Sequence, residues 1–177
     1  MTTPKILPII IAPAPILRQP TKLVEQITPA ILQLLDNMLA TMYAAPGIGL
    51  AGPQVGSDLA VAVIDISSGR GGENRQPLKL INPKIVAQST ELAEYEEGCL
   101  SIPRIFGVVK RPEMVRVQYI DEFGVEQVLE ADGLLATCLQ HEIDHLNGVL
   151  FWDHLSLLKR NSAQRKHDKN LRLRIDD

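Results

Sequence analysis

The pattern of apolar and polar positions divides the chain into two helical stretches and several extended ones. Apolar residues recur at helical spacing after residue 28, at Ile31, Leu34, Leu35, Met38, Leu39 and Met42. Thr28 can cap this helix, Pro29 suits its first turn, and the dipeptide at residues 46–47 would end it. The pattern turns helical again from Gly133, where Leu134, Leu135, Cys138, Leu139, Glu142 and His145 lie close to one side.

Four stretches dense in β-branched residues are predicted as strands, at residues 59–66, 78–86, 114–120 and 125–131. The last two flank residues 121–124, so they predict an antiparallel hairpin. The Gly/Ser/Asn-rich residues 67–77 are expected to form a single flexible loop. The sequence therefore predicts one α+β domain over residues 1–177, with antiparallel or mixed sheets packed around a central helix. An N-terminal helix and a basic, helical C-terminal tail over residues 155–177 complete this prediction.

The composition is that of an ordinary soluble globular protein. Hydrophobic residues make up 45% and charged residues 22% of the chain, and the formal net charge of −3 gives no indication of nucleic-acid binding. The apolar run at residues 6–17 is broken by prolines and is shorter than the roughly 20 residues that a membrane span needs. No small-residue cleavage site follows it. We therefore expect a cytoplasmic protein, in which Cys99 and Cys138 bind, react or pack separately rather than pair.

Residues 140–148, QHEIDHLNG, carry the pattern most informative about chemistry. On a helix, His141 and His145 lie one turn apart on the same face, so both imidazoles can bind a single metal ion. Glu142 lies next to that face and can take a proton from a metal-bound water. Matches to H-E-x-x-H also arise by chance. Two hydrogen-bonded or exposed histidines therefore remain the alternative to a hydrolytic metal site.

The segment EEGCLSIP, residues 96–103, offers a third metal ligand. Cys99 follows a glycine with turn character and precedes a stretch that tends to be extended before Pro103. A thiolate there could complete a Cys-His-His site whose fourth position is open to water, as catalysis requires. Cys99 could equally be a small buried apolar residue.

Residues 46–56, PGIGLAGPQVG, form a glycine-rich segment whose backbone can approach a ligand closely. Gln54 within it supplies an amide that can donate a hydrogen bond to an oxygen atom. The segment lacks the Lys-Ser/Thr ending of a phosphate-binding loop, and it follows a predicted helix rather than a strand. It is therefore predicted to bind neither phosphate nor a dinucleotide.

In this order, GIGLAGPQVG, EGCLS and QHEIDH resemble the three signature motifs of the peptide deformylases. The similarity covers most of the chain, from APILRQPTKLVEQI to GVLFWDHLS. It departs from the family within a motif at Gly52, where alanine is usual and where glycine should loosen the loop. The resemblance implies that Cys99, His141 and His145 hold one divalent metal ion. It also implies removal of the formyl group from formyl-methionine of newly synthesised polypeptides, by attack of a metal-bound hydroxide and with release of formate.

The resemblance further implies roles for individual residues. Glu142 would act as the general base, while the Gln54 amide and the backbone N–H of Leu100 would donate to the developing oxyanion. The extended substrate would pair with the backbone of Ile48 and Gly49. The methionine pocket would be lined by Ile48, Leu134, Thr137, Cys138 and His141. Of these, Thr137 is more polar than the apolar residue expected in such a pocket.

The metal and the partners follow from the resemblance in the same way. Cysteine and histidine ligands suit zinc, whereas the family implies Fe²⁺ in the cell, with Ni²⁺ or Co²⁺ as active replacements and Zn²⁺ as a poor one. Asp144 is expected to pair with Arg111, the alternative being two independent solvated charges. His154 and His167 are not expected to bind the metal.

Basic residues concentrate in the tail at Lys159, Arg160, Arg165, Lys166, Lys169, Arg172 and Arg174. Because deformylases act on chains leaving the ribosome, this tail could contact ribosomal RNA through phosphate groups. The alternative is a solvated basic face.

Two other functions share part of the pattern. A zincin-type metallopeptidase also uses H-E-x-x-H, but its third ligand is usually a downstream glutamate or histidine, and Cys99 argues against that class. A non-catalytic metal-binding or ribosome-associated module would need neither Glu142 nor Gln54. Dependence of activity on the formyl group separates the deformylase from both.

Overall fold

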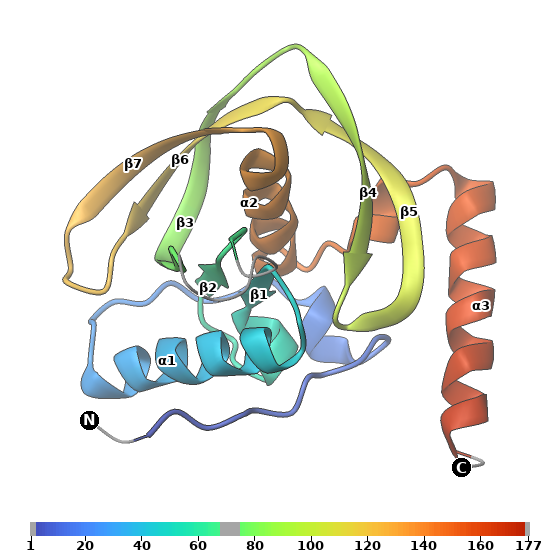
Figure 1. The fold of residues 1–177 in the computed structure, drawn as a ribbon, viewed down its shortest axis with the longest axis horizontal. Helices are drawn as coiled ribbons and strands as arrows, with labels where there is room; N and C mark the ends of the chain where they lie inside the picture. The colour runs from blue at the N-terminus through green and yellow to red at the C-terminus, as the bar shows by residue number, and fades with distance from the viewer. Residues whose placement is uncertain (1–2, 68–74, 176–177) are drawn as a thin grey trace.

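The computed structural model describes residues 3–67 and 75–175, which form an α+β fold around a central helix (Figure 1). Its elements are η1 (Pro15–Arg18), α1 (Pro29–Ala44), β1 (Gly49–Ala51), η2 (Gly52–Val55), β2 (Val61–Ile64), β3 (Leu78–Gln88), β4 (Leu92–Cys99), β5 (Ile102–Pro112), β6 (Met114–Ile120), β7 (Glu126–Asp132), α2 (Gly133–Leu146), η3 (Phe151–His154) and α3 (Leu157–Ile175). The η elements are short 3₁₀ helices.

The strands form two antiparallel sheets on either side of α2. One sheet has five strands in the order β1-β2-β3-β6-β7, and the other is the hairpin of β4 and β5. Figure 1 shows α2 in the centre, with the larger sheet on one side and the hairpin on the other. Groups on α2 therefore meet groups from both sheets.

Apolar packing holds the two main helices in place. Thr28 caps α1 by accepting a hydrogen bond from the Ile31 N–H, as predicted, at a distance of 3.4 Å. One core cluster joins α1 to the larger sheet through Leu35, Met38, Met42, Leu50, Val61 and Val63. A second joins α2 to the same sheet through Leu139, Ile143, Ala62, Leu80 and Val117. Each fully buried large side chain contributes roughly 1.5–3 kcal/mol, so the helix that carries both histidines is firmly anchored.

The predicted helices and strands are present, and β6 and β7 form the predicted hairpin. The prediction was wrong over residues 92–112, where no strand was expected and the β4–β5 hairpin lies. In β4 burial alternates over residues 92–97, but Leu92 is exposed and the one buried position is the charged Glu97, so the apolar pattern of a strand is weak. In β5 the alternation is interrupted at Arg104, which has a positive φ of 62°. The three-residue β1 was also missed. Most of the predicted flexible loop, residues 68–74, lies outside the described residues.

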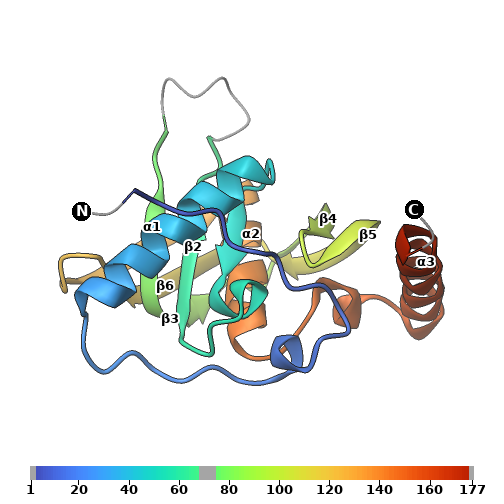
Figure 2. The same ribbon diagram turned by 90° about the horizontal axis from the view of Figure 1, so that it is seen from below.

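The C-terminal helix α3 stands at one edge of the molecule, beyond β5 (Figure 2). Between Leu157 and Leu173, His167 is the one buried residue of α3. None of the helices within the described ranges is long and apolar enough to cross a membrane.

Candidate metal centre

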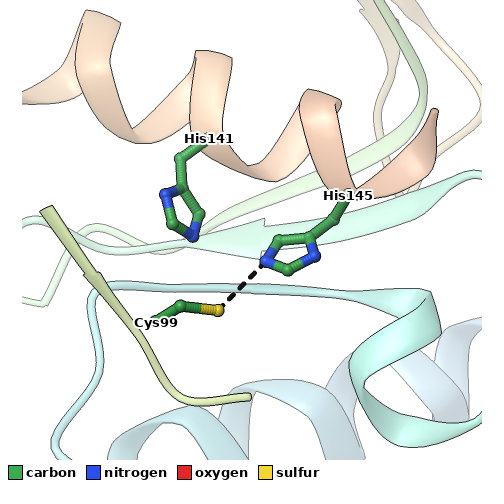
Figure 3. A group of neighbouring side chains, drawn as sticks. All are labelled: Cys99, His141 and His145. Atoms are coloured by element: carbon green, nitrogen blue, oxygen red, sulfur yellow. Dashed lines mark hydrogen bonds between the residues drawn. The ribbon is translucent and has the colours of Figure 1, made fainter. Parts of the chain in front are cut away.

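The end of β4 and one face of α2 bring the three predicted metal ligands together. One ligand atom each from Cys99, His141 and His145 lies within 4.8 Å of the other two. The Cys99 Sγ is 3.2 Å from the Nε2 of His145, and both rings project from α2 toward the thiol (Figure 3). Bonds of about 2.0–2.3 Å to one tetrahedral ion place its ligand atoms about 3.5 Å apart. The separation observed is therefore one that a single ion can bridge.

The electrostatics of the two histidines also suit a cation. Burial lowers the pKa of His145 well below its usual value, so this ring is neutral and offers a lone pair. Burial also lowers the pKa of His141, but the hydrogen bonds to Cys99 and Glu97 and the charges of Glu142 and Cys99 outweigh it and hold the pKa well above its usual value. Negative groups that retain a proton on a ring also favour a metal ion in its place.

Glu97, which was not predicted as a site residue, orients the ring of His141. Its Oε2 accepts a hydrogen bond from the Nδ1 of His141 at 2.9 Å, which leaves Nε2 for a metal ion. Arg111 donates to both Glu97 oxygens, from Nε at 2.6 Å and from Nη2 at 3.0 Å. Burial raises the pKa of Glu97, but the hydrogen bonds from Arg111 and His141 outweigh it and lower the pKa to about 2. Glu97 lies two residues before Cys99, and on a strand such residues share one face; this spacing could have indicated that Glu97 lies near the metal ligands.

The predicted pairing of Arg111 with Asp144 is confirmed. The Nη1 of Arg111 is 2.8 Å from Asp144 Oδ2, and the Nε2 of His154 is 2.7 Å from the same oxygen. Arg111 is only 5% exposed, so the alternative of two independent solvated charges is wrong. This network ties α2, β4, β5 and η3 together behind the ligands.

Glu142 presents a buried carboxylate beside the three ligands. It is 4% exposed, and its Oε2 has no hydrogen-bond partner within residues 3–67 and 75–175. Burial raises the pKa of Glu142 to about 7, although the positive charge of His141 opposes the rise. A Cβ built on Gly49 would lie 2.3 Å from Glu142 Oε1, so only glycine lets the backbone approach this carboxylate. An unpartnered carboxylate next to three ligands fits a site that holds a metal ion and a water molecule.

Gln54 approaches the ligands from η2 with its amide held in one orientation. Its Oε1 accepts from the Ala51 N–H at 2.8 Å. Its Nε2 lies 3.2 Å from Ser101 Oγ and 3.5 Å from Cys99 Sγ. Gln54 is 1% exposed and Ser101 is fully buried. The donor side of the amide therefore faces the metal ligands, and Ser101, which was not predicted, helps to hold it there.

A cavity of about 470 Å³ opens beside these groups. It is lined by the predicted residues Ile48, Gly49, Gln54, Cys99, Leu100, Leu134, Thr137, Cys138, His141 and Glu142. The structure thus brings the predicted catalytic and substrate-binding residues to one cavity, while His145 lies behind it. Tyr95, Arg104, Ile105 and Phe106 of the β4–β5 hairpin also line it and were missed together with that hairpin.

Two polar side chains of the cavity wall have their hydrogen-bonding groups occupied by the backbone. The Thr137 hydroxyl donates to the Gly133 carbonyl at 3.1 Å, so this residue is less polar toward the cavity than its type suggests. The Cys138 thiol donates to the Ile48 carbonyl at 3.7 Å, and burial raises its pKa well above the usual value. Both cysteines are free thiols.

Gly52 lies in a tight contact. A Cβ built there would be 2.7 Å from the carbonyl oxygen of Leu59. Glycine therefore allows η2 to pack closely on the chain that enters β2. The expected loosening of this loop stays a prediction.

Comparison with known proteins places these features in a family. Residues 6–161 match the polypeptide deformylase family. A curated peptide deformylase of Agrobacterium fabrum is 54% identical over 168 residues, which cover 95% of this chain and 98% of the relative. A solved peptide deformylase from Legionella pneumophila has a TM-score of 0.89 and 44% identity, with 97% of this chain and 99% of that chain covered. Another, from Synechococcus elongatus in complex with actinonin, has a TM-score of 0.86 and 47% identity, with 94% and 89% covered. The chain belongs to the polypeptide deformylase family.

Proposed function

We propose that this protein is a metal-dependent hydrolase that removes the formyl group from formyl-methionine of newly synthesised polypeptides and releases formate. Membership of the deformylase family supports this function. The observation that carries it is the buried carboxylate of Glu142, whose Oε2 has no hydrogen-bond partner in the part of the chain that the structure describes, beside Cys99, His141 and His145 at a cavity. A purely structural metal site needs no such carboxylate.

Cys99, His141 and His145 would hold one divalent ion. We expect Fe²⁺ in the cell, with Ni²⁺ or Co²⁺ as active replacements. The bound ion supplies Lewis-acid activation of water and of the formyl oxygen. The protein supplies the rest: Glu97 fixes the tautomer of His141, and the buried Arg111 holds Glu97 in place.

Glu142 would transfer the proton. Its carboxylate takes a proton from the attacking water and delivers it to the departing amine, which leaves formate and a free N-terminus. With a pKa of about 7 in the absence of a metal ion, Glu142 lies in the range where a general base also serves as an acid. Gly49 lets the Glu142 carboxylate stay at the cavity, because a side chain at residue 49 would overlap with Glu142 Oε1.

Gln54 and Leu100 would stabilise the negative charge that develops on the formyl oxygen. The Gln54 Nε2 donates to Ser101 Oγ at 3.2 Å and to Cys99 Sγ at 3.5 Å, and the hydrogen now directed at the thiol would turn to the oxyanion. The backbone N–H of Leu100, next to Cys99, would be the second donor. Each donor of this kind typically contributes about 2.7–4 kcal/mol to lowering the barrier.

The substrate would lie extended along Ile48 and Gly49, adding its backbone to the edge of β1. The methionine side chain would occupy the part of the cavity lined by Leu134, Thr137 and Cys138. With the Thr137 hydroxyl bonded to the backbone, the wall suits an unbranched apolar side chain.

We also propose that the protein acts in the cytoplasm and that the basic face of α3 brings it to the ribosome. Lys166 and Lys169 are exposed on this helix, where they can reach phosphate groups. Co-sedimentation with ribosomes at low salt tests this. The double variant Lys166→Glu/Lys169→Glu should bind less, and unchanged binding would refute the role of the helix.

The test of the proposed activity is release of formate from a formyl-methionyl peptide by anaerobically purified protein. Metal content is measured on the same sample, and Glu142→Ala is the control. We expect formate from the wild type alone. No formate from a sample with one Fe²⁺ or Ni²⁺ per chain would overturn the proposal in favour of a non-catalytic module. Cleavage within a peptide that has a free N-terminus would favour a metallopeptidase instead.

A further inference from the structure

His167 is the one buried residue of α3 between Leu157 and Leu173, and with the partly buried Ala163 it packs α3 against the body of the protein. The residue is 1% exposed, while its neighbours Lys166 and Asp168 are exposed. Its Nε2 lies 2.8 Å from the carbonyl oxygen of Ala12, so this nitrogen carries the hydrogen and donates it. A buried histidine on a helix that is otherwise exposed or half-buried therefore holds the N-terminal segment.

That N-terminal segment connects two parts of the active site. The Ala12 N–H donates to the Ser101 carbonyl at 2.9 Å, and the Ile10 N–H donates to the Gln54 carbonyl at 2.8 Å. Ser101 also accepts from the Gln54 side chain at 3.2 Å. Residues 10–12 thus set the spacing between η2, which carries Gln54, and the turn that follows Cys99.

A second path runs from His167 to a metal ligand through aromatic rings. His167 meets Trp152 edge-on, with ring centroids 5.6 Å apart. Trp152 contacts Phe151 at 6.4 Å, and Phe151 stacks on His141 at 6.3 Å and 19°. These four side chains are each at most 9% exposed, so they form a continuous packed row.

We propose that His167 is a positioning residue for the deformylation reaction. It acts on Gln54 through Ala12 and Ser101, and on His141 through Trp152 and Phe151. This inference rests on the proposed function. Its physical basis is that loss of the His167 donor leaves a buried carbonyl of Ala12 without a partner, and the segment at residues 10–12 must then shift or open. The spacing of the oxyanion donor changes with it. On this view α3 is part of the active-site scaffold as well as a basic surface.

Three variants of the full-length protein test the inference. His167→Leu keeps an apolar side chain in the row but removes the donor. His167→Gln places an amide N–H near the position of Nε2, so it should restore the hydrogen bond to Ala12. Asp168→Ala is the matched control, because it changes the adjacent exposed residue on the same helix.

Two measurements are made well below the lowest Tm of the set. The first is hydrogen–deuterium exchange of peptides that cover residues 8–14 and 50–56. The second is steady-state formate release, with metal content checked. For His167→Leu we expect faster exchange in both peptides and a kcat about three- to tenfold lower, with KM changed less than about twofold. His167→Gln and Asp168→Ala should match the wild type in both measurements.

Unchanged exchange in His167→Leu would overturn the inference, as would faster exchange with an unchanged kcat. A purely structural role would lower Tm without altering kcat at the lower temperature. If the wild type itself released no formate, the proposed function would fail. Faster exchange at residues 50–56 in His167→Leu would then still support the link from α3 to Gln54, and unchanged exchange would overturn it.

Discussion

Replacing Glu97 by glutamine should weaken the fold and metal retention together, because one carboxylate holds both Arg111 and His141. Glutamine keeps the size of the side chain but removes its charge. Arg111 then loses a charged partner in a site where its side chain is 6% exposed. The Nδ1 of His141 loses its carboxylate acceptor, so the tautomer that presents Nε2 to the metal is no longer enforced.

The size of the effect follows from burial. Removing one partner of a buried ion pair typically costs about 3–5 kcal/mol, because the other charge is left unpaired. The pKa of Glu97, lowered from 4.5 to about 2, leads to a similar value: at about 1.4 kcal/mol per pKa unit, the charged form contributes about 3 kcal/mol. Arg111 keeps Asp144 as a partner. We therefore expect a loss of about 3 kcal/mol in the free energy of unfolding, at the lower end of the range.

Urea unfolding measures this loss, with Glu94→Gln as the control on the same strand. Glu94 pairs with Lys110 at 3.1 Å, but both side chains are 59% exposed, so its loss should cost less than about 1 kcal/mol. Metal affinity of Glu97→Gln should fall about tenfold or more in a competition titration. A Glu97→Gln protein as stable as the control, with metal affinity unchanged, would refute the reasoning.

The same variant carries a pH signature. Because the pKa of Glu97 is lower in the folded protein than its ordinary value of 4.5, its contribution is present above that value and is lost as the pH falls toward 2. The difference in unfolding free energy between wild type and Glu97→Gln should therefore stay constant from pH 7 to about 4.5 and shrink as the pH falls further toward 2. A difference that stays constant down to the acid limit of folding would contradict the assignment.

The remaining predictions concern the oxyanion donor, two glycines and the metal. Gln54→Ala should lower kcat about a hundredfold or more in the formate assay, because one oxyanion donor is lost; an unchanged kcat would remove Gln54 from the mechanism. Gly49→Ala should abolish formate release while the protein stays folded by circular dichroism, because the new Cβ would lie 2.3 Å from Glu142 Oε1 and displace that carboxylate. Gly52→Ala should lower the free energy of unfolding by about 1–3 kcal/mol through the 2.7 Å contact with the Leu59 carbonyl. A gain of about 0.4–1 kcal/mol would instead indicate that glycine loosens this loop. Removal of the metal by a chelator should lower Tm, and adding back Fe²⁺ or Co²⁺ under anaerobic conditions should restore it, because an ion that binds only the folded state stabilises it; a Tm indifferent to the chelator would argue against the site.

The sequence carried most information where the determining pattern is local. The helix α2 and the placement of His141 and His145 on one face follow from apolar periodicity and a spacing of four residues, and the structure confirms both. The contribution of Cys99 depends on a contact between β4 and α2, which spacing alone does not specify. The family resemblance supplied that contact.

What the sequence did not predict has physical reasons. Glu97 is a charged residue at a buried strand position, so it breaks the apolar alternation by which a strand is identified, and the whole β4–β5 hairpin was missed with it. The Ser101 hydroxyl meets Gln54 only in the folded chain, 47 residues away in sequence. The bridge at residues 10–12 acts through backbone hydrogen bonds, which are open to any residue type. Such bonds leave no trace in the order of side chains.

The ion pairs of Arg111 with Glu97 and Asp144 also affect the net charge of the metal centre. As a metal ligand Cys99 would bind as a thiolate, and with the carboxylates of Glu97 and Asp144 it would give three formal negative charges against the one positive charge of Arg111. A divalent cation neutralises the remaining excess, whereas a monovalent cation would leave net charge in a low-dielectric interior at considerable cost. The scaffold thus favours an ion of charge +2 before ligand chemistry discriminates further. Once that ion is bound, the net charge of the centre follows the proton on Glu142, the group proposed to move it during turnover.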